Sequence, residues 1–157
     1  MIILIITGIV ILLTVFAKKI KKAMTRGYIN NNPGNIRLNN EVWQGEVVPS
    51  KDKSFKTFKS MPYGYRAIFI LLRTYINRSG LDTIRRIIST YAPSNENQTD
   101  AYIRFVSNRT GIDPDEKISL SETKKLKDIV AAISYMENGV APDLKEIDNG
   151  YLLFTKS

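Results

Sequence analysis

The chain has 157 residues, a formal net charge of +8 and neither Cys nor His. This length suits one domain with a hydrophobic core of its own. Without Cys and His, the chain has no thiol nucleophile, no Ser–His or Cys–His pair and none of the usual zinc sites. Any catalysis must therefore rest on Asp, Glu, Lys, Tyr, Ser or Thr, and we expect no metal ion and no cofactor.

The N-terminal segment is apolar and ends in a basic cluster. Residues 2–17 read IILIITGIVILLTVFA, and four lysines follow at 18, 19, 21 and 22. A run near the lower limit of about 17 residues can span a bilayer. Because the lysines follow the run, it differs from a secretory signal, and the positive-inside rule places the rest of the chain on the cytoplasmic side. The sequence thus predicts one N-terminal transmembrane helix and a single-pass membrane protein. The predicted division is an anchor with its basic flank at 1–22, a linker at 23–29 and a folded domain at 30–157.

The folded domain opens on a turn with the sequence NNNPGNIR at 30–37. Pro33 fixes its own φ, Gly34 can adopt a positive φ, and asparagine side chains bond to nearby backbone. A rigid loop rich in amides suits a neutral polar ligand such as a sugar, because amides both donate and accept hydrogen bonds. An ordinary surface turn is the alternative interpretation.

Beyond this turn the pattern predicts a small β-hairpin and then helices. Residues 36–48 favour short strands, with a turn at Gln44-Gly45. Helices are expected at 60–76, 83–91 and 100–109, and from a capping box at 119–122 to residue 137 or 138. The tail to Ser157 shows no clear period. The predicted fold class is therefore α+β, mostly α.

Glu137 is the most informative carboxylate. It follows Ile133 by four residues and Val130 by seven, so it lies on the apolar stripe of its helix. Partial desolvation and the negative end of the helix dipole both raise the pKa of such a carboxyl. A general acid for glycosidic cleavage needs that protonated state. A glutamate that reaches water or pairs with an arginine is the alternative.

Four motifs of the domain belong together: the run NNNPGNIR, Trp43-Gln44-Gly45, Phe55 with Phe58, and Gly64-Tyr65-Arg66-Ala67. In combination they resemble a lysozyme-like family found in phage virion proteins and prophage-encoded muramidases. The resemblance implies a lysozyme-like domain that acts on peptidoglycan. Many members carry a helix of the form Ala-Ile-x-x-x-Glu-x-Gly before the asparagine turn, and its glutamate is the catalytic acid. Here that form occurs late in the chain, at 132–139, which suggests a circular permutation with Glu137 as the acid.

Two other carboxylates are candidate catalytic residues: Glu46 on the predicted hairpin and Glu96 in a polar loop. A glycoside hydrolase normally needs two carboxylates. By the resemblance, a lytic transglycosylase can work with one, so we favour that reaction and leave a muramidase open. The predicted substrate-binding residues are Asn32, Gly34, Asn35, Arg37, Trp43 and Tyr91.

The predicted function is that of a membrane-anchored phage virion protein that cleaves peptidoglycan glycan strands during entry. Its expected location is the internal membrane of the virion, and its expected partners are peptidoglycan, the lipid membrane and other virion proteins. The alternative is an inactive structural protein that links capsid and membrane. We expect no specific nucleic-acid binding, because Arg85, Arg86, Arg104 and Arg109 form no known motif.

Overall fold

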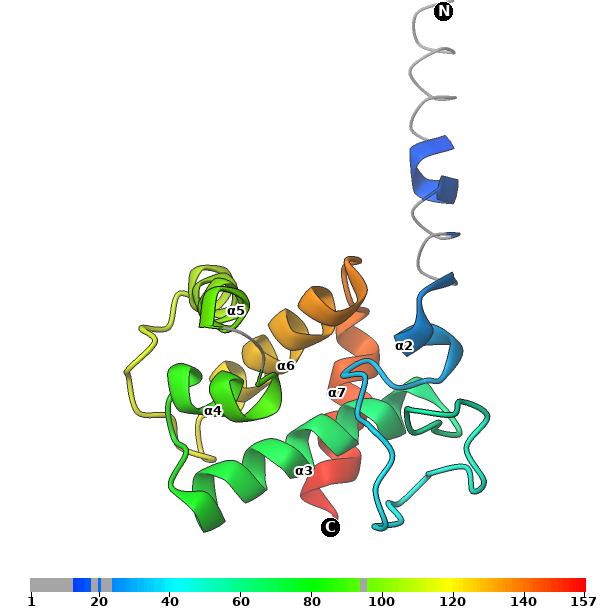
Figure 1. Ribbon diagram of the computed structural model, residues 1–157, viewed down its shortest axis with the longest axis horizontal. Helices are drawn as coiled ribbons and strands as arrows, with labels where there is room; N and C mark the ends of the chain where they lie inside the picture. Colours follow the sequence, from blue (N-terminus) through cyan, green and yellow to red (C-terminus); the bar gives the residue numbers. More distant parts are fainter. Residues whose placement is uncertain (1–12, 18–19, 21–23, 94–95) are drawn as a thin grey trace, which may run out of the picture.

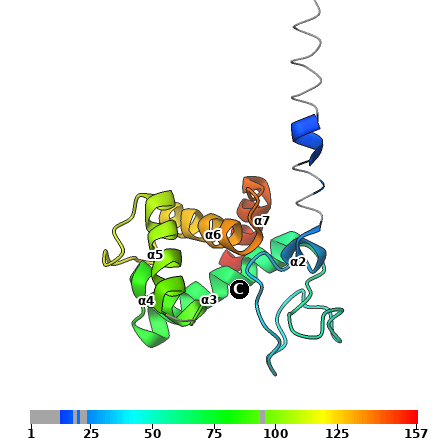
Figure 2. The ribbon, with the colours of Figure 1, turned by 45° about the horizontal axis from the view of Figure 1, so that its top comes forward.

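The computed structural model describes residues 13–17, 20, 24–93 and 96–157, and Figure 1 shows how they are arranged. The helices are α2 (Arg26–Ile29), α3 (Met61–Ser79), α4 (Ile84–Tyr91), α5 (Glu96–Thr110), α6 (Thr123–Asn138) and α7 (Leu144–Thr155). The segment between α2 and α3 lies at one end of α3, whereas α4 and α5 lie at the other end (Figures 1 and 2).

The long helix α3 is the centre of the core, as its apolar sequence predicts. Ile68, Phe69 and Leu72 are fully buried on it. The C-terminal helix α7 packs along α3: the ring centroids of Phe69 and Phe154 are 5.6 Å apart. The C-terminal tail, whose sequence shows no clear period, therefore forms a helix. This helix begins after Asp143, whose carboxylate accepts a hydrogen bond from the backbone N–H of Lys145.

The other predicted helices form with shifted starts. The hydroxyl of Thr83 caps α4 by accepting from the N–H of Arg86. α5 begins at Glu96, four residues before the predicted start. α6 ends at Asn138, and Gly139 caps it with a φ of 63°. The helix α6 packs against α5 through the stacked rings of Phe105 and Tyr135. The C-terminal end of α6 therefore has a fixed position.

The predicted β-hairpin does not form. Among the described residues there are helices and two isolated bridges, Arg37 with Phe55 and Glu46 with Phe58, but no strand. The prediction of an α+β, lysozyme-like fold is therefore wrong. The physical reason is that residues 54–59 pair with two different segments of the chain. The N–H of Lys56 donates to the carbonyl of Ile36, whereas the N–H of Lys59 donates to the carbonyl of Gly45. Each pairing is too short for a ladder.

The predicted transmembrane helix is also contradicted. In the part of the chain that the structure describes, none of the helices has the length and apolar character needed to cross a bilayer. The predicted localisation as a single-pass membrane protein is corrected on this finding. Most of the predicted anchor, at 1–12, 18–19 and 21–23, lies outside the described residues. The predicted boundaries of anchor, linker and domain, at 22 and 29, stay a prediction. The helix α2 lies within the predicted linker.

Candidate functional site

The asparagine turn is held by its own side chains. Asn31 and Asn35 adopt left-handed φ values of 49° and 46°, which asparagine tolerates better than most residues. The fully buried Asn32 side chain accepts from the N–H of Ile36 and donates to the carbonyls of Ile36 and Lys56. One amide thus bonds the turn to the segment that crosses behind it.

A glycine at position 34 lets the side chains of α3 and α4 approach the backbone of the turn closely. It does not serve a positive φ, because the residues of the turn with a positive φ are Asn31 and Asn35. The hydroxyl of Tyr91 donates to the carbonyl of Gly34. A Cβ on Gly34 would collide with that hydroxyl and would lie 3.0 Å from a side-chain carbon of Ile68. The turn therefore packs directly on α3 and α4.

The C-terminal end of α6 meets this turn from the other end of the chain. Asn138 donates to the carbonyl of Pro33 at 2.8 Å and to that of Ser134 at 2.9 Å. Next to it, the Nδ2 of Asn35 lies 3.1 Å from a carboxylate oxygen of Glu137 and 3.3 Å from its carbonyl oxygen. Residues 102 positions apart in sequence are thus in direct contact.

The second oxygen of Glu137 accepts a hydrogen bond from Tyr102 on α5, at 3.0 Å. Tyr102 is only 6% exposed, and burial raises the pKa of its hydroxyl far above the usual range, so that it stays a donor. Burial also raises the pKa of Glu137, although the bonds from Asn35 and Tyr102 favour the ionised form and oppose that shift. The net shift is upward, towards a carboxyl that keeps its proton.

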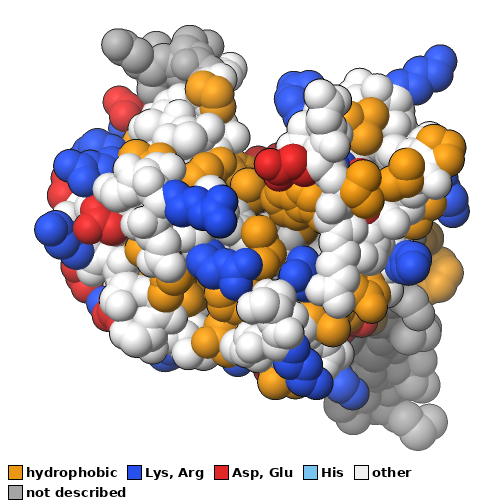
Figure 3. Space-filling view, turned by 90° about the horizontal axis from the view of Figure 1, so that it is seen from below, with side chains coloured by type: hydrophobic (Ala, Val, Ile, Leu, Met, Phe, Trp, Pro, Cys, Tyr) orange, Lys and Arg blue, Asp and Glu red, His pale blue; other side chains and the backbone are white. Residues whose placement is uncertain are grey.

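Glu137 lines a pocket of about 550 Å³. Residues from the turn, α3, α4 and α6 line it: Gly34, Asn35, Ile36, Arg37, Leu38, Asn39, Leu71, Tyr75, Thr90, Tyr91, Ala92, Pro93 and Glu137. Among them Glu137 is the one acid. Figure 3 shows one hollowed face of the molecule, with hydrophobic side chains in the hollow and an acidic side chain beside it.

The sequence is similar to a bacteriophage protein, Protein P5 of Pseudoalteromonas phage PM2. The two are 39% identical over 140 residues, which cover 87% of this chain and 85% of that protein. The chain belongs to the Protein P5 family. No family model matches it.

In this P5-family protein, the predicted residues fall into three groups. Gly34, Asn35, Arg37 and Tyr91 line one pocket with Glu137. Asn32 is buried inside the turn, and its side chain bonds to backbone groups of Ile36 and Lys56. Trp43 lies in a neighbouring hollow that shares Leu71 with the first.

Of the other two candidate acids, Glu46 does not join Glu137. The Glu46 carboxylate accepts from the buried ammonium of Lys56 at 2.9 Å and from the N–H of Trp43 at 2.9 Å. Because Lys56 also donates to the carbonyl of Glu41, this ion pair closes the loop internally. The side chain of Glu96 lies outside the described part of the structure.

Sequence reasoning missed two residues that this P5-family site uses, Tyr102 and Asn138. From the sequence, Tyr102 is one of several aromatic residues that could stack on a sugar ring, and nothing local marks it as a partner of Glu137. Asn138 did carry a signal, since a buried amide just before a C-terminal glycine must find partners outside its helix. Within the described residues, no three His, Cys, Asp or Glu side chains gather as a metal site would require.

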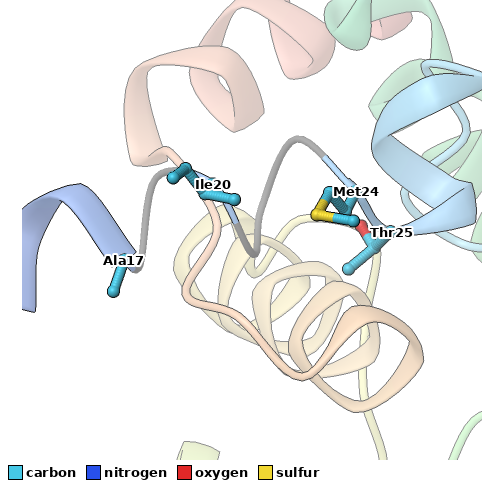
Figure 4. A pocket seen from close by; sticks show the side chains of 4 residues that line it. All are labelled: Ala17, Ile20, Met24 and Thr25. Atoms are coloured by element: carbon cyan, nitrogen blue, oxygen red, sulfur yellow. The ribbon is translucent and has the colours of Figure 1, made fainter.

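A further hollow of about 520 Å³ lies along the N-terminal segment. Its lining is Ala17, Ile20, Met24 and Thr25 (Figure 4). Among the described residues that line this hollow, the side chains are almost wholly apolar and none is ionisable, so these residues offer no acid or base comparable to Glu137.

Proposed function

We propose that this protein is a phage virion enzyme that cleaves the glycan strands of peptidoglycan during entry, with Glu137 as its general acid. The observation that carries the proposal is the contact of Glu137 with Asn35 and Tyr102 at a pocket. The virion assignment is supported by membership of the family of a phage protein. Peptidoglycan and other virion proteins are the proposed partners.

The choice of a glycan strand as substrate rests on the turn and its amides. Asn35 Oδ1 is buried and lacks a hydrogen-bond partner among the described residues. A buried acceptor without a donor is costly, and a sugar hydroxyl in the pocket supplies that donor. The resemblance of NNNPGNIR and of the helix ending at Glu137 to peptidoglycan-cleaving proteins points to the same class of substrate.

The single acid in the pocket favours a lytic transglycosylase. In that reaction the Glu137 carboxyl gives its proton to the glycosidic oxygen as the bond to the anomeric carbon breaks. The resulting carboxylate takes a proton from the 6-hydroxyl of the same sugar, as that oxygen bonds to the anomeric carbon. No second carboxylate is required to activate a water molecule. The Glu137 carboxyl needs a raised pKa for the first step, and burial provides that direction.

An inactive structural protein of the virion is the second candidate. It is favoured by one observation: both carboxylate oxygens of Glu137 accept from the chain's own donors, Asn35 and Tyr102. A glutamate held by a donor at each oxygen is also a good internal brace between α6, α5 and the turn. The two candidates differ in whether Glu137 can give its proton to a ligand.

The test is zymography of the full-length chain on purified peptidoglycan. We expect wild type to clear the substrate and Glu137→Gln to be on the order of 10²–10⁴-fold slower, because a general acid contributes about that much. Glu116→Gln is the matched control, since Glu116 is exposed, and it should clear like wild type. Product strands should end in 1,6-anhydro sugars. Clearing by Glu137→Gln at the wild-type rate would exclude Glu137 as the acid, and clearing by neither protein would favour the structural role.

A further inference from the structure

A second hollow, of about 790 Å³, lies next to the Glu137 pocket. Both have Leu71 of α3 in their lining. The residues around the second hollow are Glu41, Val42, Trp43, Gln44, Arg66, Ile70, Leu71, Arg73, Thr74, Asn77 and Arg78. We call this the arginine hollow, because α3 contributes Arg66, Arg73 and Arg78 to it.

Arg66 is the unusual member of this set. It is only 8% exposed, and its Nε finds no hydrogen-bond partner among the described residues. Buried guanidinium groups are normally paired, because an uncompensated charge away from water is costly. Burial lowers the pKa of Arg66, and the positive charge of nearby Arg73 lowers it further. The site thus keeps a buried cation beside a second cation.

The other charged groups leave Arg66 available to a ligand. The guanidinium of Arg73 stacks over the ring of Phe154 and donates to the carbonyl of Ser157. Glu41 is the one acid among the described residues that line the arginine hollow. Its carboxylate accepts from the indole N–H of Trp43 at 3.2 Å. The hollow therefore carries a net positive charge.

We propose that the arginine hollow binds a carboxylate carried by the substrate strand, while the scissile sugar lies at Glu137. This inference rests on the proposed function and names the part of the substrate that decides specificity: a glycan whose side peptide ends in free carboxylates. A guanidinium matches a carboxylate with two parallel hydrogen bonds. Trp43, at the edge of the same hollow, offers a ring face to a neighbouring sugar.

The test measures binding in the full-length Glu137→Gln protein, so that no probe is turned over. Three probes are titrated by calorimetry: a disaccharide–tripeptide muropeptide, the same muropeptide with its carboxylates amidated, and the neutral sugar chitotetraose. We expect Arg66→Gln to weaken binding of the free-acid muropeptide on the order of 10–100-fold, the usual cost of losing a hydrogen bond to a charged group. Binding of the two probes that lack a carboxylate should not change.

Two further variants protect this test from a folding defect. Arg78→Gln changes an exposed arginine of the hollow and should weaken the free-acid probe about 3-fold, as a partly exposed charge pair does. Arg85→Gln is the matched control, because Arg85 is paired with Asp115 outside the hollow. It should bind all three probes as the parent does.

Any other pattern of binding would contradict the proposed carboxylate site in the arginine hollow. Equal weakening of all three probes by Arg66→Gln, with no selective effect of Arg78→Gln, would make the arginines structural. Unchanged binding of the free-acid probe would also exclude the anion subsite. In that case, continued binding of the two probes that lack a carboxylate would leave the proposed function intact. If the parent protein binds none of the probes, both proposals fail together.

Discussion

At the scale of single residues, opposite influences act on Glu137. Burial raises the pKa of its carboxyl, whereas the hydrogen bonds from Asn35 and Tyr102 lower it. The donors make the carboxyl rigid, and desolvation decides the direction of the shift. Tyr102 is therefore a positioning residue whose removal should make the acid weaker still.

We predict that Tyr102→Phe raises the pKa of Glu137 above that of wild type, because the lost bond favours the ionised carboxylate. Titration of the Glu137 side-chain carboxyl by ¹³C NMR measures this directly. Tyr63→Phe is a suitable control, since Tyr63 is half-buried outside the pocket. A pKa that stays the same or falls in Tyr102→Phe would contradict the assigned contact.

The same substitution has a pH-dependent effect on stability. A carboxyl with a raised pKa binds more protons in the folded state than in the unfolded state, so the free energy of unfolding falls as pH rises through the interval between the two pKa values. Tyr102→Phe extends that interval upward. Its destabilisation should therefore be larger above the interval than below it. Urea unfolding across the acidic and neutral range checks the sign.

The meeting of Glu137 with Asn35 could be expected from the resemblance to the lysozyme-like family, in which the helix that carries the catalytic glutamate lies next to the asparagine turn. The contact distance of 3.1 Å agrees with that expectation. Tyr102 and Arg66 could not be predicted as members of a site. Their roles depend on which helix faces which, and a tyrosine or an arginine on a helix carries no local mark of its neighbour.

At the scale of elements, the asparagine turn replaces the hairpin that the β-branched residues at 36–48 predict. Strand propensity describes how side chains fit a pleated surface, and it carries no information about a competing side chain. Here the amide of Asn32 takes both backbone groups of Ile36. The N–H of Ile36 is therefore not free to extend a ladder, although its carbonyl also accepts from the N–H of Lys56. Among the described residues, this segment forms isolated bridges and no strand.

We predict that Asn32→Ala destabilises the protein by about 3 kcal/mol, because three buried hydrogen bonds are lost at roughly 1 kcal/mol each. The bonds are those to the N–H and carbonyl of Ile36 and to the carbonyl of Lys56. Asn40→Ala, at an exposed position, is the control and should be nearly neutral. Urea denaturation gives both values, and equal effects of the two variants would show that the turn is not braced by Asn32.

At the scale of the whole molecule, the end of the chain returns to its beginning. The helices α6 and α7 come last, yet α6 ends against the asparagine turn and α7 packs along α3. The helices α3 to α6 were predictable from their periodicity and caps, whereas α2 falls in the predicted linker. The helix α7 was not predictable, because its sequence shows no clear apolar period and contains a glycine, Gly150. The structure shows that this glycine is the point where α7 crosses α3.

We predict that Gly150→Ala destabilises the protein by about 1–3 kcal/mol, the usual cost of overpacking. Helix propensity alone predicts the opposite sign, because Ala is better than Gly inside a helix by about 1 kcal/mol. The steric clash determines the sign of the change in stability, because an added Cβ would lie 2.6 Å from the Cβ of Tyr65 and 2.9 Å from the carbonyl oxygen of Pro62. Backbone and Cβ atoms of α3 cannot move without shifting the helix that lines both hollows.

Urea unfolding of Gly150→Ala beside Leu152→Ala separates these effects. Leu152 is 56% exposed on the same helix, so its truncation should change stability by only a few tenths of a kcal/mol, as surface substitutions usually do. A gain in stability for Gly150→Ala would mean that α7 does not approach α3 this closely. Because α3 carries Leu71 between the Glu137 pocket and the arginine hollow, a destabilised Gly150→Ala should also weaken glycan binding. Leu152→Ala should leave that binding unchanged.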